Sequence, residues 1–276
     1  MAYLLSTENF LKMSEYVYRK SGIHLEEEKH YEKLAKYIDS RASKLGVDNF
    51  RKYFFKLRFE DKSGEEFQDL MNGITVNETY FFREKDQFEV LVNKILPELH
   101  ETLPASKTLR ILSSPCSTGE EPYSMILHIV EEGNIVEQRD IEIVGIDIDS
   151  TVIEKAKKAK YTERSVHAIP KGILAKWFKK NSLGYELGED LQGSVDFQVA
   201  NVFDKTQMRN LGKFDVIFSR NMLIYFDDAS RKEVAMTFYD MLNPGGYVLL
   251  GHAEYMSRIV SVFKAKKIDN TLIYQK

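Results

Sequence analysis

The spacing of apolar residues along the chain changes near residue 109. Before that point, apolar side chains recur every three or four residues, as on the buried face of an amphipathic helix. Phe10, Met13 and Val17 form one such set, which begins after a capping Ser6 or Thr7. Further sets within residues 31–45, 50–57 and 67–71 complete four expected helices. Residues 1–70 are therefore predicted to form an N-terminal all-α domain, in which Gly22 and Gly46 end the first two helices.

From residue 109 onward, short apolar runs alternate with helical segments. Runs at residues 109–112, 141–146, 195–199, 214–219 and 247–251 are typical of parallel strands buried on both faces. The last two are separated by a helix at 230–242 and by a Pro-Gly-Gly turn at 244–246. Residues 263–268 and 271–275 flank Asp269-Asn270 and read as an antiparallel hairpin. We predict a Rossmann-like, doubly wound parallel sheet closed by this hairpin, in an α/β domain of residues 71–276.

The helices of this second domain are predicted from prolines, glycines and capping residues near their ends. Residues 87–99 are expected to form a helix that stops near Pro97 and Pro104. Residues 122–132 follow the first strand, with Pro122 at the first helical position and Gly133 at the end. Thr151 and Glu154 indicate a capping box for a helix at 152–160.

Composition narrows the classes of function. The 276 residues carry a net charge of −3, which does not favour a nucleic-acid partner. One cysteine excludes an internal disulfide, and the six histidines lack metal-ligand spacing, so we expect no metal site. The N-terminus does not resemble a signal peptide, and no apolar run is long enough to cross a membrane. A cytoplasmic enzyme without membrane insertion is expected.

The segment LRILSSPCSTGEEPYS, residues 109–124, runs from strand through small residues into a helix. This arrangement places a ligand site at the carboxyl end of a strand in α/β folds. It lacks G-x-G-x-x-G and G-K-[ST], and its acids Glu120 and Glu121 suit a ligand with hydroxyls or a positive charge rather than a phosphate. An ordinary strand-to-helix connection explains the same residues equally well.

Polar residues also follow the next strands. Asp147 ends the second strand, where an acid binds ribose hydroxyls in nucleotide-binding folds. Asn201 ends the third and is placed to meet an adenine edge, and Arg220-Asn221 end the fourth. Dinucleotide enzymes and S-adenosylmethionine enzymes both fit. The missing glycine fingerprint disfavours the first class and the terminal hairpin favours the second.

Several motifs in order make the comparison specific. They are N-x-T-x-F-F-R-E at 77–84, C-S-T-G-E-E-P-Y-S at 116–124, D-I-D at 147–149, S-R-N-M-L-I-Y-F-D at 219–227, P-G-G at 244–246 and G-H-A-E at 251–254. Together they resemble the chemotaxis receptor methyltransferase (CheR) family over nearly the whole chain. The resemblance implies S-adenosylmethionine-dependent methyl esterification of glutamate side chains on the cytoplasmic helices of chemoreceptors, with S-adenosylhomocysteine as the product.

The resemblance also implies roles for individual residues. The positions that match the family's cofactor contacts are Asn77, Thr79, Arg83, Glu121, Asp147, Asn201, Val202, Arg220 and Asn221. Arg83 is expected to pair with a carboxylate of the cofactor or to hold the substrate glutamate. Tyr225 matches an active-site tyrosine whose hydroxyl orients the acceptor, so Arg83 and Tyr225 are the candidate catalytic residues. Cys116 is interpreted as a small loop-filling residue rather than a nucleophile.

Two segments that bind receptors in the family have a different charge or glycine pattern in this sequence. The second N-terminal helix keeps Lys33, Lys36, Arg41 and Lys44 but adds Glu32 and Asp39, which weakens a purely electrostatic docking surface. The family's inserted β-subdomain falls at residues 161–195. We expect it not to bind a receptor's C-terminal pentapeptide, because its glycines are single and its strands are charged. A monomer is expected. Another S-adenosylmethionine-dependent O-methyltransferase, or a catalytically silent CheR-like scaffold, stays open as an alternative.

Overall fold

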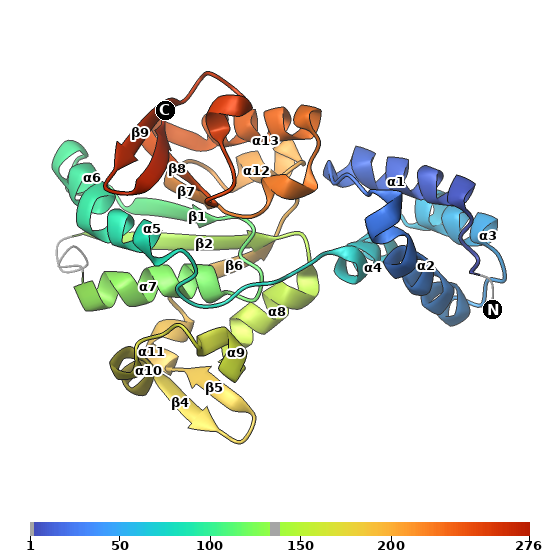
Figure 1. The fold of residues 1–276 in the computed structure, drawn as a ribbon, viewed down its shortest axis with the longest axis horizontal. Coiled ribbons are helices and arrows are strands. Elements are labelled where there is room, and N and C mark those ends of the chain that lie inside the picture. Colours follow the sequence, from blue (N-terminus) through green and yellow to red (C-terminus); the bar gives the residue numbers. More distant parts are fainter. Residues whose placement is uncertain (1–2, 133–138) are drawn as a thin grey trace.

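The computed structural model describes residues 3–132 and 139–276, which form a helical domain and an α/β domain joined by one linker (Figure 1). The helical domain contains the four predicted helices: α1 (Thr7–Ser21), α2 (Glu27–Lys44), α3 (Phe50–Phe55), which continues as the π-helical η1 (Lys56–Glu60), and α4 (Glu65–Ile74). They enclose a core of their own that includes Met13, Ile38, Tyr53 and Leu70.

The ends of α1 follow from local chemistry. The Ser6 hydroxyl accepts a hydrogen bond from the Asn9 amide, and Gly22 ends the helix with a left-handed φ of 72°. Gly46 also adopts a positive φ just beyond α2, as predicted. Helix α4 runs on to Ile74, so the predicted domain division at residue 70 falls inside a helix and stays a prediction.

A seven-stranded sheet forms the centre of the α/β domain, in the order β6-β2-β1-β7-β8-β10-β9. Its strands are β1 (Leu109–Ser113), β2 (Ile141–Asp147), β6 (Val195–Val199), β7 (Phe214–Ser219), β8 (Leu242–Leu250), β9 (Lys264–Ile268) and β10 (Thr271–Gln275). The first five in spatial order are parallel, and β10 is antiparallel to both of its neighbours. The predicted Rossmann-like sheet with a C-terminal antiparallel hairpin is confirmed.

Helices cover both faces of this sheet (Figure 1). Alternate strand residues divide between two cores, since Ile111 and Phe218 belong to one and Leu112 and Ile217 to the other. The first core includes residues of α5 (Lys85–Val90), the π-helical η2 (Leu91–Ile95), α6 (Leu96–Thr102), α7 (Glu120–Glu132) and α8 (Ser150–Lys158). The second includes residues of α12 (Lys205–Asn210) and α13 (Asp228–Met241).

Three local predictions are wrong, whereas the helix predicted at 87–99 with a stop near Pro97–Pro104 is present and ends at Thr102, just before Pro104. It runs through Pro97, which stands near the start of α6, directly after the π-helical η2. Helix α7 begins at Glu120, so Pro122 is its third residue. Asp149 caps α8 in place of the predicted Thr151–Glu154 box. The Pro-Gly-Gly segment lies within β8 as an irregularity in its pairing with β7. The predicted end at Gly133 lies outside the described residues.

A small subdomain is inserted between α8 and β6, as predicted for residues 161–195. Its antiparallel sheet has the order β3-β5-β4, from β3 (Lys160–Tyr161), β4 (Phe178–Asn181) and β5 (Gly184–Leu187). Three short helices accompany it: α9 (Glu163–Val166), α10 (Lys171–Trp177) and α11 (Glu189–Gln192). Across residues 3–132 and 139–276, no helix combines the length and the apolar character that a membrane crossing requires.

Candidate active site

A crevice lies at the carboxyl ends of β1, β2 and β7 and consists of two adjoining hollows. The first, of about 770 Å³, extends toward the helical domain, and the second, of about 840 Å³, extends toward Arg83 and Glu121. Five residues line both, namely Val76, Asn77, Pro115, Asp147 and Tyr225. The hollows therefore form one continuous site where α/β folds place ligands.

All ten residues that the sequence singled out line this crevice. Asn201 and Val202 line the first hollow. Thr79, Arg83, Glu121, Arg220 and Asn221 line the second, and Asn77, Asp147 and Tyr225 line both. Residues up to 148 positions apart in the chain, from Asn77 to Tyr225, are thus brought together by the sheet topology.

Asp147 is the last residue of β2 and is buried beneath both hollows. One carboxylate oxygen accepts the Ser117 amide at 2.9 Å, and the other accepts the Asp149 amide at 3.0 Å. Burial raises the pKa of Asp147 to about 6, although these two hydrogen bonds oppose the shift. A buried carboxylate without a cation beside it favours a ligand that donates hydrogen bonds to it.

The acids of the β1–α7 segment point in different directions. Glu120 accepts hydrogen bonds from Thr118 and from Ser165 of the inserted subdomain, so it ties that subdomain to the loop. Glu121 faces the crevice, and its Oε1 accepts the Ser113 hydroxyl at 2.7 Å. Burial raises the pKa of Glu121, against the opposing charge of Arg220. Cys116 is buried and its thiol pKa is raised by burial, which fits the predicted loop-filling role.

Arg83 and Tyr225 lie together at the second hollow. The Arg83 guanidinium lies 6.0 Å from the centre of the Tyr80 ring and donates to the Glu78 carbonyl at 3.3 Å. Burial raises the pKa of Tyr225, while the positive charge of Arg83 acts in the opposite direction. The tyrosine hydroxyl therefore stays protonated near neutral pH and can donate a hydrogen bond.

Asn77 is held by an acid that the sequence did not assign to the site. Its side-chain amide donates to Asp149 Oδ2 at 2.8 Å, and the Thr75 hydroxyl donates to the same oxygen at 3.0 Å. The other oxygen of Asp149 caps α8. Asp149 thus fixes the linker beside Asp147, and its place in the D-I-D motif was the signal that could have indicated it.

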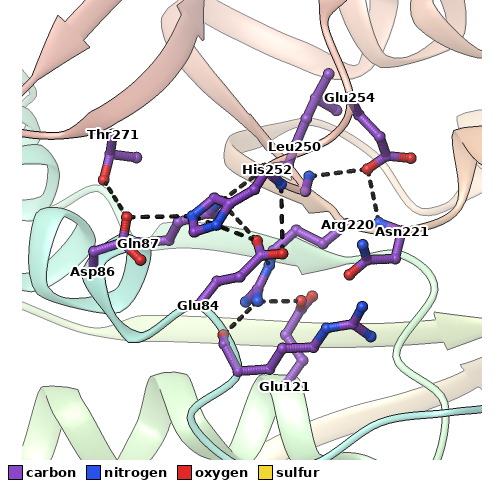
Figure 2. A network of polar contacts seen from close by, with 12 residues as sticks. Glu84, Asp86, Gln87, Glu121, Arg220, Asn221, Leu250, His252, Glu254 and Thr271 are labelled. Atoms are coloured by element: carbon purple, nitrogen blue, oxygen red, sulfur yellow. Dashed lines mark hydrogen bonds and ion pairs between the residues drawn. The ribbon is translucent and has the colours of Figure 1, made fainter.

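Glu254, the last residue of the G-H-A-E motif, shapes the turn that carries Asn221 (Figure 2). Its carboxylate accepts the backbone amides of Gly251, Asn221 and Leu223 at 2.9, 2.7 and 2.8 Å. Asn221 has a left-handed φ of 57°, a conformation that costs energy and persists because its surroundings hold it. The turn then continues as η4 (Leu223–Tyr225).

The end of α1 and the segment that follows it form a wall of the first hollow, through Ser21, Ile23 and Leu25. Ile23 pairs with Phe226 in an isolated antiparallel bridge, and the His24 amide donates to the Tyr225 carbonyl at 2.9 Å. The helical domain is therefore bonded to the turn that carries the candidate catalytic tyrosine. No sequence motif indicated this contact, because it joins two domains.

Asn201 is partly engaged within the protein. Its Nδ2 donates to the Lys20 carbonyl at 2.7 Å, and its Oδ1 accepts the Phe203 amide at 3.0 Å. One N–H and one lone pair of the carboxamide remain for a ligand. Val202 is buried beside it.

The carboxylates and apolar side chains that line the crevice fit S-adenosylmethionine. Carboxylates at Asp147 and Glu121 match ribose hydroxyls and an ammonium group, and the apolar walls of Ile23, Ile146 and Val202 match an adenine ring. Among residues 3–132 and 139–276, no group of three or more His, Cys, Asp or Glu side chains is arranged to hold a metal ion.

Comparison with known proteins identifies the family. A family model described as "CheR methyltransferase, SAM binding domain" matches residues 77–272. This chain belongs to the CheR methyltransferase family. Its activity is accordingly that of an S-adenosylmethionine-dependent chemotaxis protein methyltransferase, as the sequence resemblance implied.

Curated relatives match over nearly the full chain. Chemotaxis protein methyltransferase 2 of Vibrio cholerae is 42% identical over 274 residues, covering 99% of this chain and 94% of the relative. A chemotaxis protein methyltransferase of Borreliella burgdorferi is 35% identical and covers 91% of this chain and 89% of the relative. That of Salmonella typhimurium is 30% identical, covering 95% and 88%. These CheR relatives therefore span the helical domain as well as the sheet.

Proposed function

We propose that the crevice binds S-adenosylmethionine along its length and that the enzyme methylates glutamate side chains on the cytoplasmic helices of chemoreceptors. The adenosine end occupies the first hollow and the amino-acid end the second. The single observation that supports this orientation is the position of Asp147, buried at the junction of the two hollows beside Tyr225, with Glu121 further along the second.

At the adenosine end, Asp147 accepts hydrogen bonds from the ribose hydroxyls. The free N–H and lone pair of Asn201 serve the adenine edge, together with the backbone of Val202. Asn77, whose amide is already bonded to Asp149, contributes mainly through the position of its backbone beside Asp147. These roles use the buried acids and amides at the ends of β2 and β6.

At the amino-acid end, Glu121 complements the ammonium group. Arg83 binds either the cofactor carboxylate or the acceptor glutamate, since its guanidinium lines the second hollow. Thr79 and Asn221 complete the wall, and Arg220 holds Glu121 in place.

The chemistry requires alignment more than proton transfer. The cofactor supplies an electrophilic methyl group when bound. A glutamate acceptor is ionised near pH 7, with a reference pKa of about 4.3, so no general base is needed. Tyr225 donates a hydrogen bond that orients the acceptor carboxylate, and Arg83 draws that carboxylate into the hollow. Correct orientation can lower the barrier by about 7–11 kcal/mol. The products are a glutamate methyl ester and S-adenosylhomocysteine.

Receptor docking does not depend on a basic face of α2. Arg41 is committed to Glu66 and Asp69, and the Lys33 ammonium donates to the backbone carbonyls of Ile74 and Thr75. Lys36 pairs with Glu32 at 3.3 Å. Three of the four cations kept from the family pattern are thus paired within the protein. The receptor instead meets the helical domain and the mouth of the crevice, and the enzyme works as a cytoplasmic monomer at receptor arrays.

The inserted subdomain does not bind a C-terminal receptor pentapeptide in this proposal. Its edge strand β4 exposes Lys179 and Lys180, and charged residues on an edge strand disfavour the addition of another strand. Titration of a receptor C-terminal pentapeptide should give no heat. Micromolar binding that disappears when residues 180–193 are replaced by a short linker would contradict this part of the proposal.

The central test is transfer of a labelled methyl group from S-adenosylmethionine to a cytoplasmic receptor fragment. Label released as methanol in mild alkali identifies a carboxyl methyl ester. We expect the wild-type enzyme to produce it and the Asp147→Ala variant to lose most affinity for S-adenosylhomocysteine, since unpaired ribose hydroxyls cost about 1–3 kcal/mol. Alkali-stable label would refute esterification, and unchanged affinity in Asp147→Ala would refute the ribose role.

A further inference from the structure

Arg220 lies between two carboxylates (Figure 2). Its Nη1 is 3.3 Å from Glu121 Oε2, and its Nε is 3.3 Å from Glu84 Oε2. The side chain of Arg220 is 2% exposed and those of both acids are 13% exposed, so water screens these pairs weakly. One buried cation is therefore shared by two acids that are themselves only slightly exposed.

The position of Arg220 is fixed from further sides. Its guanidinium lies 5.1 Å from the centre of the Phe88 ring, and its Nη2 donates to the Arg83 carbonyl. Glu84 is held as well, because it accepts the Gln87 side-chain amide at 3.1 Å and the His252 backbone amide at 3.4 Å. Neither charge can swing away to leave the other alone.

Because Arg220 is shared with Glu84, its positive charge does not fully compensate the negative charge of Glu121. If Glu121 were the sole partner of Arg220, the pair would be neutral at the wall of the second hollow. With Glu84 on another nitrogen of the same guanidinium, the three side chains carry a net charge of −1 when both acids are ionised. Glu121 and Arg220 line the hollow, so this excess negative charge acts on a ligand bound there.

We infer that Glu84 is a positioning residue that occupies Arg220 and so preserves the attraction of Glu121 for the ammonium group of the cofactor. The inference rests on the proposed orientation, in which that ammonium group lies beside Glu121. Glu84 itself touches neither the cofactor nor the acceptor in this account, and acts only through Arg220.

The test compares two adenosine ligands by calorimetry. Decarboxylated S-adenosylhomocysteine keeps the ammonium group and has no carboxylate, whereas methylthioadenosine lacks both. Their affinity ratio contains the attraction for the ammonium group together with the contribution of the two methylene groups that carry it, so a change of the ratio between variants that keep the same apolar walls reports on the ammonium group. We expect Glu84→Gln to lower the wild-type ratio about tenfold, because a unit charge acting across about 10 Å at an effective dielectric constant of about 20 has an effect of this size. Methylthioadenosine affinity should stay within twofold.

Two further variants control this comparison. Asp86→Asn removes a charge from the same helix, but Asp86 contacts His252 and Thr271 rather than Arg220, so the ratio should not change. Glu84→Asp keeps the charge and should restore most of the ratio. An equal loss for both ligands in Glu84→Gln, an unchanged ratio in that variant, or no wild-type preference for the amine would overturn the inference. Wild-type methylation of a receptor fragment tests the proposed function separately.

Discussion

The buried position of Asp147 predicts that cofactor affinity depends on pH. The pKa of Asp147 is raised from its ordinary value of 3.8 to about 6 in the protein without cofactor. Ribose hydroxyls donate hydrogen bonds to the ionised carboxylate, so cofactor binding lowers this pKa again. Binding must then release a proton whenever the pH is below about 6. Affinity is fully present above that pH and is lost as the pH falls through it.

The magnitude follows from the fraction of Asp147 that is ionised. For a pKa of about 6, that fraction falls from about nine-tenths at pH 7 to about one-tenth at pH 5. S-Adenosylhomocysteine should therefore bind about tenfold more weakly at the lower pH, which corresponds to about 1.4 kcal/mol. The stability of the cofactor-free protein changes in the opposite direction, because a raised acid pKa in the folded state favours folding as the pH falls through this range.

Calorimetric titration of S-adenosylhomocysteine at several pH values between 5 and 8 measures the effect. The ammonium and carboxylate of the ligand stay ionised throughout, so the change reports on the protein. Asp147→Asn should bind weakly with a flatter profile, and Glu121→Gln isolates the contribution of the other buried acid, whose pKa is also raised. Affinity that does not change between pH 5 and 7 in the wild type would refute the reasoning.

Three other outcomes are expected. Tyr225→Phe should lower turnover on a receptor fragment about tenfold, while its affinity for S-adenosylhomocysteine stays within twofold. Arg83→Ala should lower both turnover and this affinity. Wild-type turnover in Tyr225→Phe would remove Tyr225 from the mechanism. Gly22→Ala should lower the free energy of unfolding in urea by about 1–3 kcal/mol, because its φ is 72° and an added Cβ would lie 2.6 Å from Phe203; an unchanged midpoint would contradict this. Cys116 should resist iodoacetamide near pH 8 until the protein is denatured, and rapid labelling of the folded protein would show that the thiol is accessible.

The sequence predicted the sheet well because its strands carry their burial in their composition. All six residues of β7 are buried, and the predicted bounds of this strand and of β6 match the structure. The predicted burial of β6 on both faces is wrong, because β6 lies at an edge of the sheet and is exposed at three of its five residues. The errors lie where one residue's local preference competes with its surroundings. Helix α7 begins two residues before Pro122, and Asp149 replaces the predicted cap of α8 because its carboxylate also receives Thr75 and Asn77.

The site was predictable in part for a related reason. Strand-end residues such as Asp147 are placed by the topology of parallel sheets, so their convergence could be expected from the chain alone. The partners of Arg220 could not, since Glu84 precedes α5, Glu121 lies in α7, and the two meet only after packing. Spacing within one element carries no information on such contacts.

The contact between Ile23 and Phe226 means that the α/β domain does not form the crevice by itself. The stretch that matches the CheR family model starts at residue 77, yet a wall of the first hollow is built from residues before it. A chain trimmed to the matched stretch would cut β10 of the main sheet after Leu272 and would lose one side of the first hollow.

Chimaeras between relatives inherit the same dependence. A helical domain taken from another relative would place its own α1–α2 segment against the turn that carries Tyr225 in this α/β domain. Receptor preference and cofactor affinity would then be transferred together rather than independently. Recombination within this family should succeed most often when the crossover keeps the segment around Ile23 and the turn around Phe226 from the same parent.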